Sequence, residues 1–519
     1  MRLRLLALGA ALALTPVVAP AEAHAPPYPC VSAVGGVNLQ TGTVLDMQRA
    51  MAARRLTSEQ LVRAYLGRIA AWNASAELNA IRAVNPNALR DAKALDAERR
   101  RGKVRGPLHG IPVLLKDNVG TTGIPTTAGS IALAGNLPKN DATITARLKA
   151  AGAVILGKTN LSEFANWVDL SMPNGYSSLG GQVVNPYNGG DPSGSSSGSG
   201  VAGTMAFAAL TIGTETSGSI LSPSDANGLV GVKPSMGLAS RYGIIPLAPS
   251  FDVPGPMVRT VTDAAAMLGV IAGTDPKDAA TAEAQVPKGG YLPLLKKDAL
   301  KGVRLGVPSA DNRPSGERGQ VFERAIADLQ KAGATIVESD LLGSTALGSL
   351  AELGLIPNEF KWSLNEYLAN EAGPAVKTRT LSAIIEYNKQ HPDKVKYGQS
   401  LLEASDATPG LGPLATASAV PVQAQAQAAI DSALAADDLD AIVELGPSNA
   451  NVGAAAGYPT VIVPAGVTGD GTLPVGLAFT GTAFAEPRLL AFAYAYEQAS
   501  RRRVPPTYVN DDLRRNGCR

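Results

Sequence analysis

The sequence predicts an α/β fold, built as a single large α/β/α sandwich around a mixed, mostly parallel sheet. Short apolar runs that suit buried strands alternate with longer segments whose apolar residues recur at helical spacing. This alternation is typical of a sheet that helices cover on both faces. The 55 glycines and 37 prolines also indicate many turns, which argues against a helical bundle.

The expected elements follow from helix caps and apolar runs. Thr57 is a hydroxyl cap and Gln60 lies three residues later, so we expect a helix there that buries Leu61 and Ile69. Further helices are expected over 141–151, 316–332 and 489–500. Strands are expected over 111–115, 153–156, 334–337, 441–445 and 460–464. Because no repeat or clear linker divides the chain, we expect one large domain over 24–519.

Composition narrows the possible partners. The chain has 519 residues, with 46 Lys+Arg against 44 Asp+Glu and a formal net charge of +2. Proteins that bind nucleic acids or anionic membranes normally carry a strong basic excess, so neither partner is expected. Hydrophobic residues make up 45% of the chain, enough to bury a large core. With 3 His and 2 Cys, a His-rich metal site has little room and a four-cysteine zinc site is excluded.

The N-terminus has the pattern of a secretory signal. Arginines precede a mostly apolar stretch over 5–18, and Ala-Glu-Ala at 21–23 is a small-x-small cleavage site. We therefore expect residues 1–23 to be removed and the mature protein to be secreted or periplasmic. No later apolar run is long enough to cross a membrane, so the mature form is expected to be free of one. Cys30 and Cys518 either form a disulfide or stay free thiols, and both alternatives are open.

Two segments of small residues could each build a catalytic loop. Residues 192–200 resemble a flexible Gly/Ser linker when taken alone. The apolar run over 201–209 contradicts that interpretation, because a mobile tether seldom leads straight into a buried helix. A second turn of small residues follows over 213–220. On such a turn a glycine-flanked serine can point its hydroxyl outward while neighbouring N–H groups converge, as an oxyanion hole requires.

A serine nucleophile needs a base, and the chain offers two candidates. His109 is the first, since histidine is the usual base. Lys116 is the second: it closes the apolar run over 112–115, and burial there would disfavour its ammonium form and lower its pKa. A surface lysine at a strand end is the ordinary alternative, and the pattern alone links neither residue to the serine loops.

Together these segments resemble the amidase signature family. Residues 110–118 resemble its lysine motif, 193–199 its Gly/Ser loop and 213–220 its serine turn. The similarity extends over about 40–505, nearly the whole mature chain. Further matching segments lie at 141–143, 157–160, 227–234, 254–257, 464–466 and 473–477.

The resemblance implies a Ser–cis-Ser–Lys triad on an α/β/α sandwich. Ser219 would be the nucleophile, Ser195 the relay on a cis peptide bond, and Lys116 the base. The family mechanism uses no metal, no organic cofactor and no histidine, so His109 would be structural. The implied oxyanion hole consists of the backbone N–H groups of Thr216, Ser217, Gly218 and Ser219.

The chain departs from the family pattern close to this site. Glu215 stands where the family usually has Asp, and Ser217 replaces a glycine beside the expected oxyanion hole. Other departures are Ser193, Ser197 and Leu221. The turn over 215–219, the stretch over 242–246 and the export signal are most similar to bacterial peptide amidases, which release ammonia from C-terminally amidated peptides. A general small-molecule or aryl amidase or esterase is the alternative.

Hypotheses from other classes compete with this one. A non-catalytic exported binding protein on the same scaffold would be expected to have lost a triad residue, yet all are present. A transamidating subunit that passes ammonia to a tRNA-borne substrate is disfavoured by the export signal and the balanced charge. A Ser-His-Asp esterase would use His109 with Ser196, but no apolar strand precedes that Gly-x-Ser-x-Gly pattern. Asn166, Trp167 and Asp169 either line a substrate pocket or belong to the scaffold.

Overall fold

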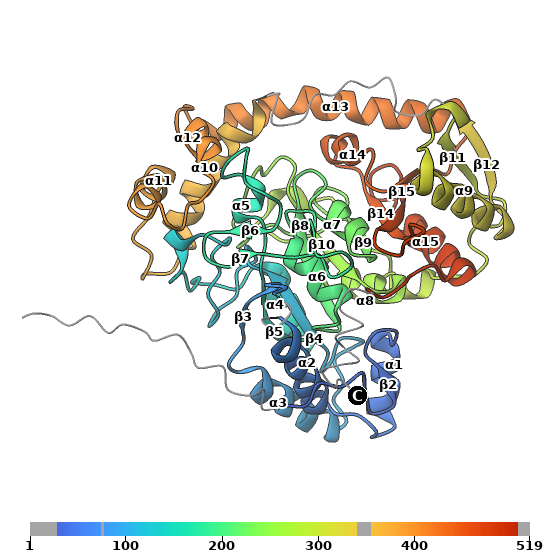
Figure 1. Cartoon of the computed structure of the whole chain (residues 1–519), viewed down its shortest axis with the longest axis horizontal. Coiled ribbons are helices and arrows are strands. Elements are labelled where there is room, and N and C mark those ends of the chain that lie inside the picture. The colour runs from blue at the N-terminus through green and yellow to red at the C-terminus, as the bar shows by residue number, and fades with distance from the viewer. Residues whose placement is uncertain (1–27, 74–76, 340–353, 507–519) are drawn as a thin grey trace, which may run out of the picture.

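The computed structural model describes residues 28–73, 77–339 and 354–506. The expected signal segment and Cys518 lie outside these ranges, so cleavage and export stay predictions. Cys30 takes part in a disulfide, which is one of the two alternatives that the sequence left open. The described chain folds around an 11-stranded sheet with helices packed against it (Figure 1). The α/β fold that the sequence predicts is thereby confirmed.

The order of strands across the large sheet is β12-β11-β13-β15-β14-β9-β10-β8-β4-β5-β3. Two short ribbons, β1 with β2 and β6 with β7, stand apart from it. The strands are β1 Ala33–Val34, β2 Val37–Asn38, β3 Ile81–Val84, β4 Pro112–Lys116, β5 Val154–Thr159, β6 Tyr176–Ser177, β7 Gly181–Gln182, β8 Leu210–Glu215, β9 Val230–Lys233, β10 Val253–Val258, β11 Arg304–Pro308, β12 Thr335–Ser339, β13 Ala441–Leu445, β14 Thr460–Val467 and β15 Pro474–Thr480.

The sheet is mixed, as predicted, but the expectation of mostly parallel pairing is wrong. Parallel pairs are confined to β12–β11–β13 and to β8–β4–β5, and every other pair of neighbours is antiparallel. The reason lies in the connections. Parallel neighbours need a long crossover, whereas β14 and β15 are joined only by residues 468–473 and pair as an antiparallel hairpin.

The helices account for most of the remaining described chain. They are α1 Val44–Ala52, α2 Ser58–Trp72, α3 Ala88–Arg100, α4 Thr143–Ala150, α5 Glu163–Asn166, α6 Ser197–Thr204, α7 Leu221–Ala226, α8 Val261–Ile271, α9 Gly316–Lys331, α10 Leu355–Asn370, α11 Leu381–Lys389, α12 Ser400–Asp406, α13 Gly412–Ala436, α14 Ala450–Ala456 and α15 Glu486–Ser500. Short 3-10 turns lie at Ile131–Leu133, Ala279–Thr281, Leu292–Leu294 and Ala310–Asn312.

The elements predicted from caps and apolar runs are present, with bounds that shift by a few residues. Thr57 caps α2, and its side-chain oxygen accepts the Gln60 N–H at 3.1 Å in the expected capping box. The other helices predicted are α4, α9 and α15, and the strands predicted are β4, β5, β12, β13 and β14. Local signals therefore located these segments well.

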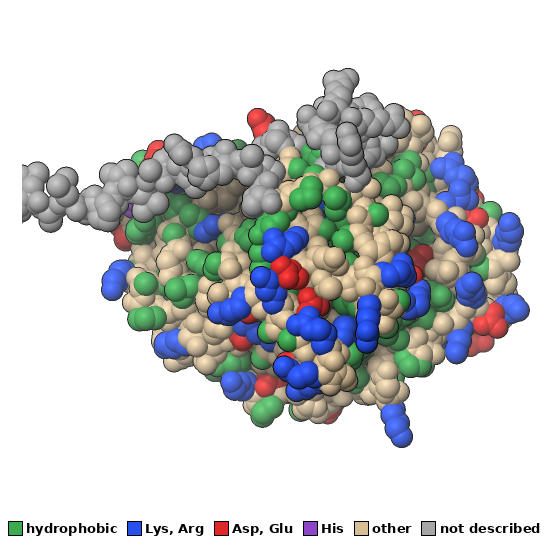
Figure 2. Space-filling model, turned by 90° about the horizontal axis from the view of Figure 1, so that it is seen from below, with side chains coloured by type: hydrophobic (Ala, Val, Ile, Leu, Met, Phe, Trp, Pro, Cys, Tyr) green, Lys and Arg blue, Asp and Glu red, His purple; other side chains and the backbone are tan. Residues whose placement is uncertain are grey.

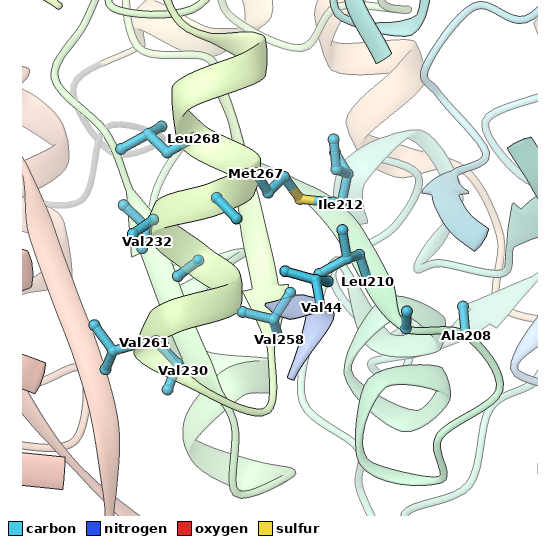
Figure 3. Packing of buried hydrophobic residues seen from close by; sticks show 14 of the residues in the cluster. Val44, Ala208, Leu210, Ile212, Val230, Val232, Val258, Val261, Met267 and Leu268 are labelled. Atoms are coloured by element: carbon cyan, nitrogen blue, oxygen red, sulfur yellow. The ribbon is translucent and has the colours of Figure 1, made fainter. Parts of the chain in front are cut away.

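Side chains alternate between the two faces of the sheet, and each face meets its own helices. Leu210 and Ile212 of β8 point toward α8, as do Val230 and Val232 of β9 (Figure 3). Gly231, between the two valines, faces α7, because a Cβ there would lie 2.4 Å from Ser224 Oγ. This period-two alternation is what a sheet covered on both faces requires.

A second apolar cluster lies beside the sheet, built largely from α10 to α14. In Figure 1, α13 runs from the α10–α12 group toward the edge that carries β11 and β12. Phe360 of α10 meets Phe164 of α5 edge to face, with ring centroids 5.8 Å apart. Leu247 belongs to the same cluster. This helical group therefore supports α5 and the loop that carries Leu247.

The surface carries mixed charges. Figure 2 shows Lys and Arg side chains interspersed with Asp, Glu and hydrophobic side chains. Arg63 pairs with Glu59 at 2.7 Å, and Arg105 pairs with Glu98. Within the described ranges, no helix combines the length and the apolar character needed to cross a bilayer.

Leu268→Ala is expected to lower the free energy of unfolding by about 2–5 kcal/mol, because this fully buried side chain packs between α8 and the sheet. Leu414→Ala on α13 is the matched control, since Leu414 is 63% exposed and its truncation removes little packing. Urea unfolding followed by circular dichroism measures both variants. Equal losses of stability in the two would contradict the packing described here.

Candidate active site

Lys116 is the last residue of β4, and its side chain is fully buried. Its Nζ donates to Ser195 Oγ at 2.8 Å and to the Thr214 carbonyl oxygen at 3.1 Å. Burial lowers the pKa of Lys116 to about 7, and the negative charges of Asp252 and Glu215 oppose that shift. Near neutral pH an unprotonated amine is therefore available, as a general base requires.

The Gly/Ser segment is a buried loop that leads into a buried helix, rather than a linker. The peptide bond between Gly194 and Ser195 is cis. The hydroxyls of Ser196 and Ser199 donate to backbone carbonyl oxygens of β8 at 3.0 and 2.9 Å, which fixes α6 against the sheet. With these neighbours engaged elsewhere, Ser195 supplies the hydroxyl that faces Lys116.

Ser219 lies in the turn between β8 and α7 and is 8% exposed. Glu215 holds this turn: its Oε2 accepts the N–H groups of residues 220–221 at 2.6 and 2.9 Å. Gly218 has a φ of 78°, a left-handed conformation that glycine adopts without strain. The Ser196 N–H donates to the Ser219 carbonyl oxygen at 3.3 Å, so the two serine loops are tied together.

The turn presents unoccupied backbone donors. Among the described residues, the N–H groups of Thr216, Ser217 and Ser219 have no hydrogen-bond acceptor. The Gly218 N–H differs, because it stabilises the Glu215 carboxylate. Of the N–H groups expected to form an oxyanion hole, those of Thr216, Ser217 and Ser219 are therefore free to bind a developing oxyanion.

The structure contains one of the two hydrogen bonds expected in the serine relay. Lys116 and Ser195 are hydrogen-bonded, whereas the Ser219 hydroxyl makes no hydrogen bond with Ser195 in the described part of the chain. Catalytic hydrogen bonds are often long without substrate and tighten in the complex. The three residues thus lie in one site, and the hydrogen bond between Ser195 and Ser219 is the interaction that is not formed among the described residues.

Lys116 is not the only buried lysine, a fact that the sequence pattern missed. Lys158 of β5 and Lys233 of β9 are buried too, and burial lowers the pKa of each to about 8. Asp117 lies 3.9 Å from Lys158, and the charge of Glu215 raises the pKa of Lys233. Lys116 differs because, within the described chain, its Nζ bonds only to a hydroxyl and a carbonyl. Its partners, rather than its burial alone, distinguish it.

His109 does not meet the serine loops. It precedes β4, at the opposite end of the strand from Lys116. Its Nδ1 accepts the Arg105 N–H at 3.4 Å, so the ring proton is on Nε2, which lies 3.0 Å from the Leu95 carbonyl oxygen. Both ring nitrogens are therefore engaged with the scaffold, and burial lowers the histidine pKa. This arrangement gives the Ser-His-Asp hypothesis no base.

A cavity of about 180 Å³ lies beside the serine turn. Thr214 and Thr216 line this cavity where it adjoins the serine turn, and Asp252 lines it next to Thr216. Arg241 and Asp278 form an ion pair at 2.5 Å in its wall, and the rest of the lining is mainly apolar. Across residues 28–73, 77–339 and 354–506, no group of three or more His, Cys, Asp or Glu side chains could hold a metal ion.

The sequence did not decide whether Asn166, Trp167 and Asp169 line a pocket or belong to the scaffold, and the structure places them differently. Asn166 lines a second, more open cavity of about 560 Å³. Trp167 and Asp169 instead hold α12: the indole Nε1 donates to Ser405 Oγ at 2.9 Å, and the carboxylate accepts the Ser400 N–H at 2.9 Å. Trp167 and Asp169 therefore belong to the scaffold.

Known proteins are similar to this chain in sequence and in fold. A family model described as amidase matches residues 60–408. The chain is 40% identical over 488 residues to a probable amidase of Arabidopsis thaliana, with 91% of this chain and 92% of that protein covered. A glutamyl-tRNA(Gln) amidotransferase subunit from Moorella thermoacetica is 33% identical over 492 residues, with 88% and 96% covered. The native peptide amidase from Stenotrophomonas maltophilia has a similar structure, with a TM-score of 0.84, 43% identity and coverage of 90% and 98%.

The buried Lys116 side chain is expected to make stability depend on pH. Its folded pKa of about 7 lies below the ordinary 10.5, so the unfolded chain binds this proton first and the folded state loses stability as the pH falls between those values. Lys116→Met abolishes this titration. Relative to wild type, the free energy of unfolding of K116M should rise by about 2–3 kcal/mol from pH 9 to pH 6.

Urea unfolding at several pH values measures this difference. Lys297→Met, at an exposed position, is the matched control and should show no such trend. A difference between K116M and wild type that stays constant with pH would show that Lys116 titrates normally.

Proposed function

Because the chain belongs to the amidase signature family and is an amidase, we propose that it cleaves carboxamides through an acyl-enzyme on Ser219. Ser195 acts as the proton relay and Lys116 as the base. The preferred substrates are C-terminally amidated peptides, from which the enzyme releases ammonia. The observation that carries the proposal is the 2.8 Å hydrogen bond from the buried Lys116 amine to Ser195.

Acylation begins with the neutral Lys116 amine. Lys116 takes the proton of Ser195 Oγ as Ser195 takes the proton of Ser219 Oγ, and Ser219 attacks the amide carbonyl carbon. The lysine becomes an ammonium ion, and the carbonyl oxygen becomes an oxyanion. The position of Ser195 beside Lys116 supports this order of transfer, because within the described residues the amine bonds to the Ser195 hydroxyl and not to Ser219.

The oxyanion is stabilised by the turn that carries the nucleophile. The N–H groups of Thr216, Ser217 and Ser219 have no other acceptor among the described residues, so they need not break a bond to bind it. Donors held in place in this way typically contribute about 2.7–4 kcal/mol each to the barrier reduction. Glu215 keeps the turn in shape through its bonds to the following backbone.

Collapse of the tetrahedral intermediate breaks the carbon–nitrogen bond. The proton held on Lys116 returns through Ser195 to the leaving nitrogen, which departs as ammonia. Water then enters, gives a proton to the same relay and attacks the acyl carbon. Release of the carboxylic acid restores the Ser219 hydroxyl and the neutral amine, so protons balance over the cycle.

Two observations support peptide amides as substrates. The peptide amidase from Stenotrophomonas maltophilia is similar over almost its whole length, at 43% identity. The open cavity of about 560 Å³ is lined by polar side chains, including Asn166, Asn174, Gln182 and Asp191, that suit a peptide backbone. A Cβ at Gly194 would lie 2.9 Å from Asn174 Oδ1, so this cavity borders the residue before Ser195.

Ser219→Ala should reduce kcat at least about 10⁴-fold, because the bond-forming atom is lost while the fold is kept. Ammonia release from a peptide amide, with the unfolding midpoint measured in parallel, tests this. Ser222→Ala is the matched control: this hydroxyl lies in α7, one turn from the nucleophile, and should be dispensable. Full activity in S219A would refute the assignment of the nucleophile.

A panel of amides separates peptide amidase from general amidase. We expect kcat/KM to fall steeply from peptide amides to the matching free amino-acid amide and to small aryl amides, since only a peptide can fill the open cavity. Ammonia release measures every member of the panel with one readout. Equal or higher kcat/KM for the small amides would assign the chain to the general amidases.

A further inference from the structure

Asp252 immediately precedes β10, far along the chain from the serine turn but next to it in space. Val253 of β10 pairs with Glu215 of β8 in the antiparallel ladder. The ladder therefore places Asp252 opposite Thr216, the first residue of the turn that carries Ser219. Asp252 lies outside the segments of the chain that resemble the family motifs.

The two carboxylate oxygens of Asp252 join the serine turn to a neighbouring loop. Oδ1 accepts the hydroxyl of Thr216 at 2.5 Å. Oδ2 accepts the N–H groups of Leu247 at 2.8 Å and Ala248 at 3.0 Å. A single carboxylate thus fixes where the turn begins, and it draws the Thr216 hydroxyl away from the oxyanion donors beside it.

The charge of Asp252 also acts on the base. Lys116 has two anions near it, Asp252 and Glu215, and neither contacts its Nζ. The cation that faces Asp252 is Arg241, whose guanidinium is already paired with Asp278, with Nε to Oδ2 at 2.9 Å. In the part of the chain that the structure describes, Asp252 therefore has no direct ion pair to neutralise it, and its field reaches Lys116.

Resting on the proposed function, we propose that Asp252 is a positioning residue of the hydrolytic site. Its carboxylate holds Thr216, and with it the oxyanion turn, in place. Its negative charge stabilises the Lys116 ammonium ion that forms when Ser219 attacks. Asp252 touches neither the substrate nor the reacting atoms, so both effects pass through other groups.

Burial raises the pKa of Asp252 to about 6, and bonds from Thr216 and from the backbone of 247–248 oppose that rise. Above that pH the carboxylate is charged, which covers the range in which Lys116 loses its proton. Removing the charge should lower the lysine pKa further. The rise of kcat/KM with pH, which reports deprotonation of the base, should then move to lower pH.

Asp252→Asn and Thr216→Val separate the two effects. D252N removes the charge, and we expect kcat for a peptide amide to fall at least about tenfold with KM nearly unchanged, while the pH rise of kcat/KM shifts downward. T216V removes the hydroxyl donor but keeps the carboxylate, so kcat should fall and the pH rise should shift less than in D252N. Asp263→Asn is the matched control, since it also removes a buried carboxylate, one that accepts the Val44 N–H and does not contact the serine turn.

The outcomes are distinguishable. A D252N enzyme with the wild-type kcat and pH profile, or with a loss confined to KM, would overturn the proposal while leaving the proposed function intact. If D252N does not fold by circular dichroism, T216V decides, and an unchanged kcat there overturns the role of the contact. Wild-type protein without amidase activity would instead refute the proposed function itself.

Discussion

A lysine amine held out of water without a carboxylate in contact is the constraint on which the site depends. Lysines are almost never fully buried unless they are paired, since removing an ammonium ion from water is costly. Lys116 has only a hydroxyl and a carbonyl oxygen within hydrogen-bonding distance among the described residues. Its neutral form is therefore favoured, and the Ser195 hydroxyl beside it is the group that can donate a proton to its lone pair.

The surrounding charges are arranged so that this state persists. Asp117 and Glu215 serve the other buried lysines, Lys158 and Lys233, while Glu215 also binds the backbone after Ser219. Asp252 is held by Thr216 and by backbone N–H groups. Each anion thus has donors of its own, and the base experiences their fields without an ion pair that would fix its proton.

The sequence predicted those features that depend on local patterns. The Thr57 cap, the apolar run that ends at Lys116 and the small-residue turn around Ser219 each carry a signal within a few residues, and the structure contains all of them. Strand pairing carries no such signal. The strands β15, β14, β9 and β10 separate the two parallel parts of the sheet, and their direction depends on connections and on partners distant in sequence. Mostly parallel pairing was therefore the part of the fold predicted wrongly.

The residues of the site likewise differ in whether a local sequence motif reveals them. Lys116, Ser195 and Ser219 could be proposed because each lies in a recognisable motif, although the burial of Lys158 and Lys233 shows that the strand-end pattern alone is not specific. Asp252 reaches the turn only through the pairing of β10 with β8. The pairing of two strands places this buried carboxylate beside the turn, and no local sequence pattern indicates such a pairing. The tertiary structure was therefore needed to find it.

The pH dependence of Ser219 labelling by a serine-directed fluorophosphonate tests the central claim most directly. The labelling rate follows the fraction of Lys116 that is unprotonated, because only the neutral amine can activate the nucleophile through Ser195. We expect a single adduct on Ser219 by peptide mass spectrometry, a rate that rises with pH through about 7, and no labelling of K116M. A rate that rises only near the ordinary lysine pKa of 10.5, or an adduct that forms equally fast in K116M, would contradict the role of the buried amine.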